Sequence, residues 1–406
     1  MTSHAIAPAR RPPLTPFRLW VAGLVVLIVA GLVGAFYVLR YGLAVTNLTD
    51  QVPWGLWITL DLSAIALGAG AFTFSAVVYL LKVRRFEPVA RLAVFIGFLG
   101  YSAAMMALVM DIGRPDRFWH PLIFWNVHSV LWEITWCVIL YFTILLVEFV
   151  PTLVDSPAFD TRPRLRRLGH SLHRFTPLAA VFGLALSLLH QSSLGATYGV
   201  LSGRAIWFKP SLPVMFIISA VAGGTALTLL ATLLTGKLSR RRYVSDELRH
   251  SMARLTGFAL LAYLYLKLWD WAATSYYAHS PGTADALARL AVTSPYQSTF
   301  WWFEVLLAGV IPAVILLAAR LRRDDRLLMM ALGLIVAGVV VNRWNVTLSG
   351  LVAPPHWSPG VLGNVTAAAY FPSPVEIAVA LGIIGYALLA FTLGARYLPL
   401  FPHGEQ

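Results

Sequence analysis

Three acidic residues stand inside long apolar stretches of this sequence, where a charged group is expensive to bury. Asp61, Glu133 and Asp270 are each flanked by mostly hydrophobic residues. A carboxylate inside a membrane-spanning helix usually marks a path for ions or protons. Such groups exchange protons, so they suit a site where electron transfer is matched by proton transfer, as in quinone chemistry. We therefore predict that these three carboxylates supply or accept the protons of a quinone.

Further ionisable residues stand near the ends of other apolar stretches, on the same side as the three acids. Pairing at a helix end, such as Asp111 with Arg114 three residues later, is the simpler interpretation of several of them. The alternative is that they line one site, with His190 as the hydrogen-bond partner of a quinone carbonyl, although a histidine at a helix end is often only a cap. The residues concerned are Asp111, His190, Glu304, Arg343 and Glu376.

Arginine, tryptophan and lysine side chains complete the candidate binding site. Arg343 either holds a carboxylate ionised or steadies a reduced quinone, or it forms a simple salt bridge. Trp132 and Trp136 adjoin Glu133 and can pack on a planar ring, although most tryptophans at this depth belong to the interfacial aromatic belt. Lys267 is about one turn from Asp270 and is its expected salt-bridge partner if it has no role in proton transfer.

One acidic residue, Glu148, stands at the opposite end of its apolar stretch. It follows Glu133 by fifteen positions, which is ~22 Å along a helix and about 60° around it. The positions between them on that face include Cys137 and Leu140, so this helix alone cannot conduct protons. Our hypothesis is that Glu148 is the inner mouth of a proton path; a carboxylate at the level of the lipid headgroups is the alternative.

Ten long apolar segments position these residues. Each has about 20 or more residues, enough to cross ~30 Å of hydrocarbon as a helix. Only 12% of the 406 residues are charged and 58% are hydrophobic, so the sequence predicts an all-α, polytopic transmembrane bundle. A single domain is expected, with tails at 1–17 and 398–406 around a bundle at 18–397. The segments are 18–40, 56–82, 88–111, 127–150, 174–198, 211–236, 252–277, 299–319, 327–348 and 374–397.

Most of the 31 lysines and arginines stand in alternate connections between the segments. The positive-inside rule places those connections and both termini in the cytoplasm. The net charge of +13 is therefore explained by topology and lipid headgroups, and we expect no nucleic-acid partner. The apolar run that begins near Trp20 and ends at Leu39 is too long for a signal peptide and is expected to remain as the first helix.

The cysteines and histidines of the sequence limit which metal-containing cofactors the chain can bind. Cys137 is the single cysteine, so the chain alone can ligate no iron–sulfur cluster. A bis-histidine haem needs paired histidines within spans, whereas only His128 and His190 come near the candidate site, both at helix ends. We expect no bound metal and no haem in this chain, with one haem held by His128 and His190 as the alternative. The embedded carboxylates suit a quinone, either menaquinone or ubiquinone, as the bound substrate.

Seven short stretches resemble the NrfD/polysulfide-reductase family, and in particular its hydrogenase-2-type branch. The likeness runs in order over about residues 18–400, and it departs near Asp270, where that branch carries Glu, and in the loops at 196–210 and 278–298. The stretches are Pro53–Asp61, Asp111–Arg114, Asn126–Glu133, Glu148–Pro151, His190–Gly195, Phe303–Leu307 and Tyr370–Pro372.

The resemblance implies a quinone-reactive membrane subunit of a respiratory oxidoreductase in the bacterial cytoplasmic membrane. In this family a ferredoxin-like iron–sulfur subunit docks on the outer face, here expected at loops 112–126, 191–210 and 349–373. For the hydrogenase-2 branch the other partners are the large and small [NiFe] hydrogenase subunits. Polysulfide, tetrathionate or nitrite reductases and alternative complex III are the other assemblies that the family serves. The quinone headgroup is expected among the second, fourth, fifth and seventh apolar segments.

Two other function classes fit many helices and buried acids. A secondary transporter usually shows related halves and broken helices around a midplane site, and neither is evident in this sequence. A passive anchor for catalytic subunits predicts that Asp61, Glu133 and Asp270 can be neutralised together without loss of quinone reduction.

Overall fold

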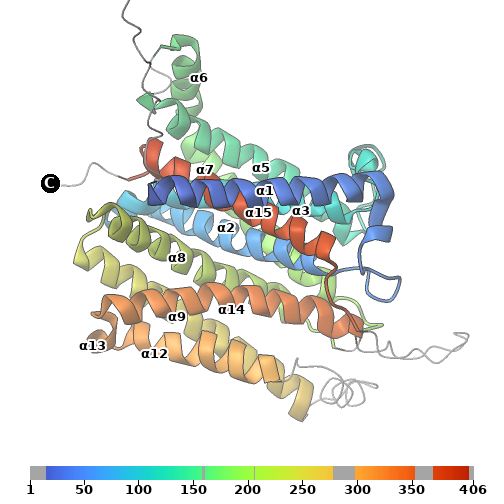
Figure 1. The fold of residues 1–406 in the computed structure, drawn as a ribbon. Helices are drawn as coiled ribbons and strands as arrows, with labels where there is room; N and C mark the ends of the chain where they lie inside the picture. Colours follow the sequence, from blue (N-terminus) through green and yellow to red (C-terminus); the bar gives the residue numbers. More distant parts are fainter. Residues whose placement is uncertain (1–14, 158–160, 205, 278–297, 353–368, 402–406) are drawn as a thin grey trace, which may run out of the picture.

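The computed structural model describes residues 15–157, 161–204, 206–277, 298–352 and 369–401, and every long element in these ranges is a helix (Figure 1). Most of the expected tails at 1–17 and 398–406, and much of the loops at 278–298 and 349–373, lie outside the described residues. The spans are α1 (Pro16–Tyr41), α2 (Leu56–Leu80), α3 (Glu87–Asp111), α5 (Val130–Val154), α7 (Thr176–Gly199), α8 (Leu212–Ser239), α9 (Asp246–Ala272), the π-helix η6 (Thr299–Val310) continued by α12 (Ile311–Leu317), α14 (Asp325–Val352) and α15 (Pro374–Tyr397).

The predicted all-α bundle of about ten helices is confirmed. Nine helices in the described ranges, counting η6 with α12 as one, are long and apolar enough to cross a membrane. The tenth long helix, α9, begins with the charged residues Asp246 and Glu247 and carries Arg249 and Arg254 in its next turns, which lowers its hydropathy. Short helices lie between the spans, among them α4 (His120–Ile123), α6 (Pro163–His173) and α13 (Ala319–Arg322).

Side-chain caps set where several spans begin. Ser129 accepts a hydrogen bond from the Trp132 backbone N–H, so α5 begins at Val130 and not near residue 127 as predicted. Glu133 therefore lies in the first turn of α5, and the expectation that it lies deeper in the span is wrong. Ser373 and Glu376 form a reciprocal capping box at the start of α15.

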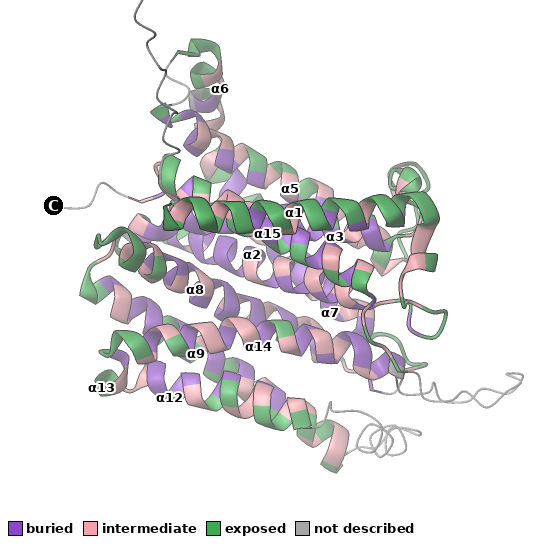
Figure 2. Ribbon diagram, viewed as in Figure 1, coloured by how far each residue is buried: buried purple, intermediate pink, exposed green. Residues whose placement is uncertain are grey.

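Glycines bring the central helices close together. A Cβ added to Gly70 of α2 would lie 1.7 Å from the Ala220 carbonyl oxygen of α8, and one added to Gly100 of α3 would lie 2.6 Å from the Ala64 oxygen of α2. Without a hydrophobic driving force between helices in lipid, such close approach is a main source of packing energy. As a result α2 is mostly buried at the centre of the bundle (Figure 2).

The spans form two packed groups beside a peripheral pair. The first group is α2, α3, α5 and α7; the second is α8, α9, η6–α12 and α14, joined to the first mainly through α2 and α8. The peripheral pair is α1 and α15, in contact through Gly31 and Gly382, and α1 exposes apolar side chains such as Val26 and Leu32 on its other face (Figure 2).

The inner ends of α1 and α15 lie together. The Arg396 guanidinium lies 4.4 Å from the centroid of the Phe17 ring, and the Trp20 indole donates a hydrogen bond of 3.1 Å to Thr392 Oγ1. Figure 1 places α6, which carries Arg164, at the same end of the bundle. We call this end the inner end and the opposite one the outer end, after the orientation expected from the sequence; the orientation itself stays a prediction.

Candidate functional site: two polar clusters in the outer half of the bundle

A buried tyrosine–histidine pair lies at the centre of a first cluster of polar residues, on α2, α3 and α7. The Tyr101 hydroxyl of α3 lies 2.7 Å from Nδ1 of His190 on α7, and both residues are fully buried. When the hydroxyl donates to Nδ1, the neutral imidazole carries its proton on Nε2 and offers it as a donor. Because His190 lies within α7 and not at its end, a simple helix-cap role does not describe it.

Several buried polar atoms on α2, α3 and α7 have no hydrogen-bond partner among the described residues. They are Thr59 Oγ1, Asp111 Oδ1, His190 Nε2 and both polar side-chain atoms of Gln191. Asp61, which is buried one turn inward from Trp57, lies within electrostatic range of Asp111 and of Tyr101. Buried polar groups are normally paired, so a concentration of unpaired ones on α2, α3 and α7 indicates where a polar ligand or water binds. We call these residues the α2–α3–α7 cluster.

Glu133 joins the edge of this cluster through α7. Ser193 Oγ, one turn after His190, donates a hydrogen bond of 2.8 Å to Glu133 Oε1. The neighbouring tryptophans have a different role in the structure: the indole N–H groups of Trp132 and Trp136 both donate to the Pro121 carbonyl oxygen, at 2.9 and 3.3 Å. These contacts hold α4 against α5, and the structure does not bring the two rings into the α2–α3–α7 cluster.

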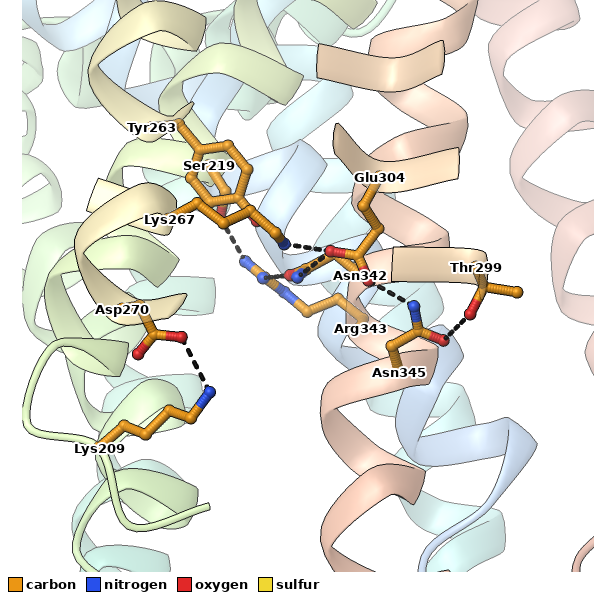
Figure 3. A network of polar contacts seen from close by, with 10 residues as sticks. All are labelled: Lys209, Ser219, Tyr263, Lys267, Asp270, Thr299, Glu304, Asn342, Arg343 and Asn345. Atoms are coloured by element: carbon orange, nitrogen blue, oxygen red, sulfur yellow. Dashed lines mark hydrogen bonds and ion pairs between the residues drawn. The ribbon is translucent and has the colours of Figure 1, made fainter. Parts of the chain in front are cut away.

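A second polar cluster surrounds a cavity between α8, α9, η6 and α14, which we call the α8–α14 cavity. Its volume is about 580 Å³. The expected site among the second, fourth, fifth and seventh segments shares only α9 with it, so the sequence did not predict its position. Asp270, Glu304 and Arg343 line it together with Lys209, Lys267 and Asn345 (Figure 3).

Asp270 is paired with a lysine that the sequence did not single out. Lys209, in the connection between α7 and α8, approaches Asp270 Oδ2 to 2.8 Å, and Ser211 Oγ donates to Oδ1 at 2.9 Å. The expected Lys267–Asp270 salt bridge is wrong, because Lys267 forms its ion pair with Glu304 (Figure 3). No local pattern in the sequence could have found Lys209, since it is 61 positions from its partner.

Glu304 is the centre of a buried hydrogen-bond network (Figure 3). Its carboxylate accepts from Lys267 Nζ, from Asn345 Nδ2 and, at 2.9 Å, from Asn342 Nδ2. Glu304 lies in the π-helix η6, a wide helical form that recurs at functional sites. The asparagines come from α14, three positions apart, and so face η6 together.

Arg343 is fully buried beside this network without an acidic partner among the described residues. Its Nη1 donates to Asn342 Oδ1 at 2.6 Å and its Nη2 to Ser219 Oγ at 2.9 Å. The guanidinium lies 3.7 Å from the centroid of the Phe216 ring, and Nε has no hydrogen-bond partner in the described part of the chain. A salt bridge, one of the two roles considered for Arg343, is not what the structure shows.

Glu148 lies far from both clusters, at the inner end of α5. It lines a separate cavity of about 250 Å³ together with Tyr79, Arg91 and Asp155. The residue is buried, and its Oε1 has no hydrogen-bond partner within the described ranges. A buried carboxylate on an inner cavity fits the hypothesis of a proton entry point better than it fits a residue at the lipid headgroups.

Glu376 has the local environment of a helix end. Glu376 accepts hydrogen bonds from the backbone N–H groups of Asn47 and Ser373 and from the Tyr370 hydroxyl, so its role is structural. Burial and the hydrogen bond to Glu376 raise the pKa of Tyr370, which lies in the loop before α15. The expected Asp111–Arg114 pair is wrong, because Arg114 forms a bidentate pair with Asp116.

Known proteins resemble this sequence over most of its length. Residues 44–355 match the family model described as polysulphide reductase, NrfD. The menaquinone reductase integral membrane subunit of Nitratidesulfovibrio vulgaris is 35% identical over 98% of this chain and 94% of its own. The probable Ni/Fe-hydrogenase 2 b-type cytochrome subunit of Escherichia coli is 27% identical, with 91% and 88% covered, and a component of the polysulfide reductase of Wolinella succinogenes is 24% identical, with 74% and 95% covered. This multi-pass membrane protein therefore belongs to the NrfD polysulphide reductase family.

Proposed function

We propose that this chain is the quinone-reactive membrane subunit of a multi-subunit oxidoreductase in a bacterial cytoplasmic membrane. The observation that carries the proposal is the set of buried, unpaired polar atoms on α2, α3 and α7. A quinone headgroup has two carbonyl oxygens on a flat apolar ring, and His190 Nε2–H and the Gln191 amide offer the donors that such oxygens need. The three relatives, which are named as parts of reductases or of a hydrogenase, support the same role.

The cluster also supplies proton-exchanging groups. Conversion of a quinone to a quinol consumes two electrons and two protons. Asp61 lies within electrostatic range of Tyr101, and Glu133 reaches the His190–Tyr101 pair through Ser193. In this proposal Asp61 and Glu133 exchange protons with the quinone, while His190 orients one carbonyl through Nε2.

Menaquinone is the quinone that the comparisons favour. The relative named as a menaquinone reductase subunit is 35% identical to this chain, against 27% for the hydrogenase relative. A hydrogenase-2-type assembly, with [NiFe] large and small subunits, is the second candidate. In either case electrons reach the quinone from an iron–sulfur subunit on the outer face, near the connections at 112–126 and 200–210.

Proton uptake from the inner side belongs to the same proposal. The Glu148 cavity lies at the inner end of the first helix group, which also holds the α2–α3–α7 cluster. Glu148 is the group that takes up a proton there, and polar side chains between the two sites continue the path. Thr73 and Ser187, whose hydroxyls are 3.0 Å apart between α2 and α7, are buried polar groups of this kind.

Affinity purification in a mild detergent, with the co-purifying proteins identified by mass spectrometry, tests the assembly. We expect an iron–sulfur protein and a catalytic subunit to co-purify, and the purified complex to reduce a menaquinone analogue with the electron donor of that subunit. Recovery of [NiFe] subunits identifies hydrogen as the donor or product. Isolation of the protein without any redox partner in several detergents would contradict the proposal and favour a secondary transporter.

A further inference from the structure

The α8–α14 cavity is distinct from the α2–α3–α7 cluster. None of the residues that line it belongs to that cluster, and its walls come mainly from the second helix group, with Ile206 and Lys209 from the connection between α7 and α8. The cavity extends along α9 from Tyr263 to Trp271, which is ~12 Å at 1.5 Å per residue. A volume of about 580 Å³ is in the range of sites that hold a small organic ligand.

The polar wall of this cavity carries an unmatched positive charge. Three cationic side chains, Lys209, Lys267 and Arg343, line it against two carboxylates, Asp270 and Glu304. Lys209 pairs with Asp270, and Lys267 pairs with Glu304. Arg343 is left with neutral acceptors only, and its Nε–H is unpaired among the described residues, so the wall offers a buried donor to an acceptor oxygen.

The other walls are aromatic and aliphatic. Phe216, Trp271, Phe300 and Trp301 line the cavity, together with the aliphatic side chain of Val346. Aromatic side chains of this kind pack on a flat ring. A cavity with aromatic walls and a buried hydrogen-bond donor, Arg343, therefore suits a planar ring that carries carbonyl oxygens.

The depth of Arg343 selects between a quinone and a phospholipid headgroup. Arg343 is four to five residues outward of the middle of α14 (Asp325–Val352), or ~7 Å along the helix. With α14 centred in a ~30 Å hydrocarbon layer, Arg343 lies ~8 Å inside the outer edge of that layer, where a charged phosphate is costly and an uncharged, lipid-soluble headgroup is not. The observations therefore favour a quinone over an anionic lipid.

We propose that the α8–α14 cavity is a second quinone-binding site, in which Arg343 donates a hydrogen bond to a carbonyl oxygen and the aromatic walls hold the ring. This inference rests on the proposed function, because it assigns a second binding site to the same class of substrate. The site holds a quinone without any requirement that it react there.

Photoaffinity labelling of the intact complex tests the second site. The complex is placed in lipid nanodiscs, labelled with an azido-naphthoquinone, and digested, and the labelled peptides are identified by mass spectrometry. We expect label on peptides from α9, η6 or α14 that contain cavity residues, and separate label on peptides from α2, α3 or α7. In Val346→Trp, which places a large side chain in the cavity and narrows it, label on the cavity peptides should fall about tenfold or more while label at the α2–α3–α7 cluster is unchanged.

Matched variants separate binding from folding. Val340→Trp places the same side chain on the exposed face of α14, and it should label like the parent protein. Arg343→Lys keeps the charge but removes the Nε–H and the planar fork, and it should also lower label at the cavity. A Ser349→Phe variant fills the outer part of the same cavity if Val346→Trp does not assemble.

The outcomes distinguish the two proposals. Label confined to the α2–α3–α7 peptides overturns the second site and leaves the proposed function standing. Label at neither place contradicts both. Displacement of the cavity label by an anionic phospholipid but not by unlabelled naphthoquinone also overturns the inference, because the cavity would then be a lipid site.

Discussion

The Tyr101 hydroxyl of α3 and His190 Nδ1 of α7 are 2.7 Å apart, in a part of the bundle where both side chains are fully buried. This contact fixes the orientation of the imidazole and leaves Nε2 as its remaining polar atom. A group that must meet a ligand with one defined proton is positioned in this way by a neighbour that occupies its other nitrogen. The pair therefore links α3 and α7, which both pack against α2, to the chemistry proposed at Nε2.

Removal of the Tyr101 hydroxyl should impair turnover without loss of the fold. Tyr101→Phe removes the hydrogen bond that holds the imidazole in one orientation, and such a bond is worth ~0.5–1.5 kcal/mol, so kcat/KM for a menaquinone analogue should fall roughly 2- to 12-fold. Tyr386→Phe, which removes the hydroxyl that contacts Ser102 Oγ at 3.1 Å, is the control and should have near-normal turnover. Equal effects of the two variants would show that Tyr101 has no special role.

Substitutions of Lys267 and Glu304 should have non-additive effects on the stability of the complex. Loss of one partner leaves an uncompensated buried charge, so Lys267→Met should lower the stability of the complex by ~3–5 kcal/mol. The double variant Lys267→Met, Glu304→Gln removes both charges and should be more stable than the single one. Thermal unfolding of the four proteins in nanodiscs gives the double-mutant cycle, and additive effects would exclude a direct pair.

Close packing of α2 on α8 should make Gly70 intolerant of a side chain. A Cβ at this position would lie 1.7 Å from the Ala220 oxygen, so Gly70→Leu must separate the two helices and should prevent accumulation of the folded subunit. Gly23→Leu is the matched control, because a Cβ there meets nothing within 4 Å. The amount of subunit in the membrane fraction and its elution profile in detergent measure both effects.

Neutralisation of Glu148 should uncouple proton movement from electron transfer. Glu148→Gln keeps the size of the side chain in the inner cavity but removes its exchangeable proton, so proton movement in vesicles should fall several-fold while the complex still assembles. Glu87→Gln, an exposed change at the inner start of α3, is the control. Unchanged proton movement in the Glu148 variant would contradict the proposal that protons enter at Glu148.

Much of the fold could be predicted from the sequence, because span length and hydropathy are local properties. The ranges predicted for the second and last spans, for example, begin at Leu56 and Pro374, where α2 and α15 begin. The start of α5 was missed by three residues, since the cap at Ser129 decides it and not the apolar run. That small shift moved Glu133 from the interior to the first turn.

The candidate site was only partly predictable, for a different physical reason. Asp61 was expected inside an apolar span and is buried, whereas His190 and Arg343 were expected near helix ends and are fully buried. Their partners depend on helix packing, which has no local signature. Lys267 meets Glu304 across two helices although Asp270 is nearer in sequence, and the cavity lined by these residues arises only when four helices meet.

The most direct test of the quinone-site claim is steady-state turnover of a menaquinone analogue by the purified complex carrying His190→Gln. The glutamine cannot reproduce both contacts of the imidazole, so we predict a loss of at least tenfold in kcat/KM with the partner subunits still bound. His250→Gln, the same substitution at the inner end of α9, should turn over at the parent rate. Equal turnover in the parent protein and in His190→Gln would contradict the placement of the quinone at the α2–α3–α7 cluster.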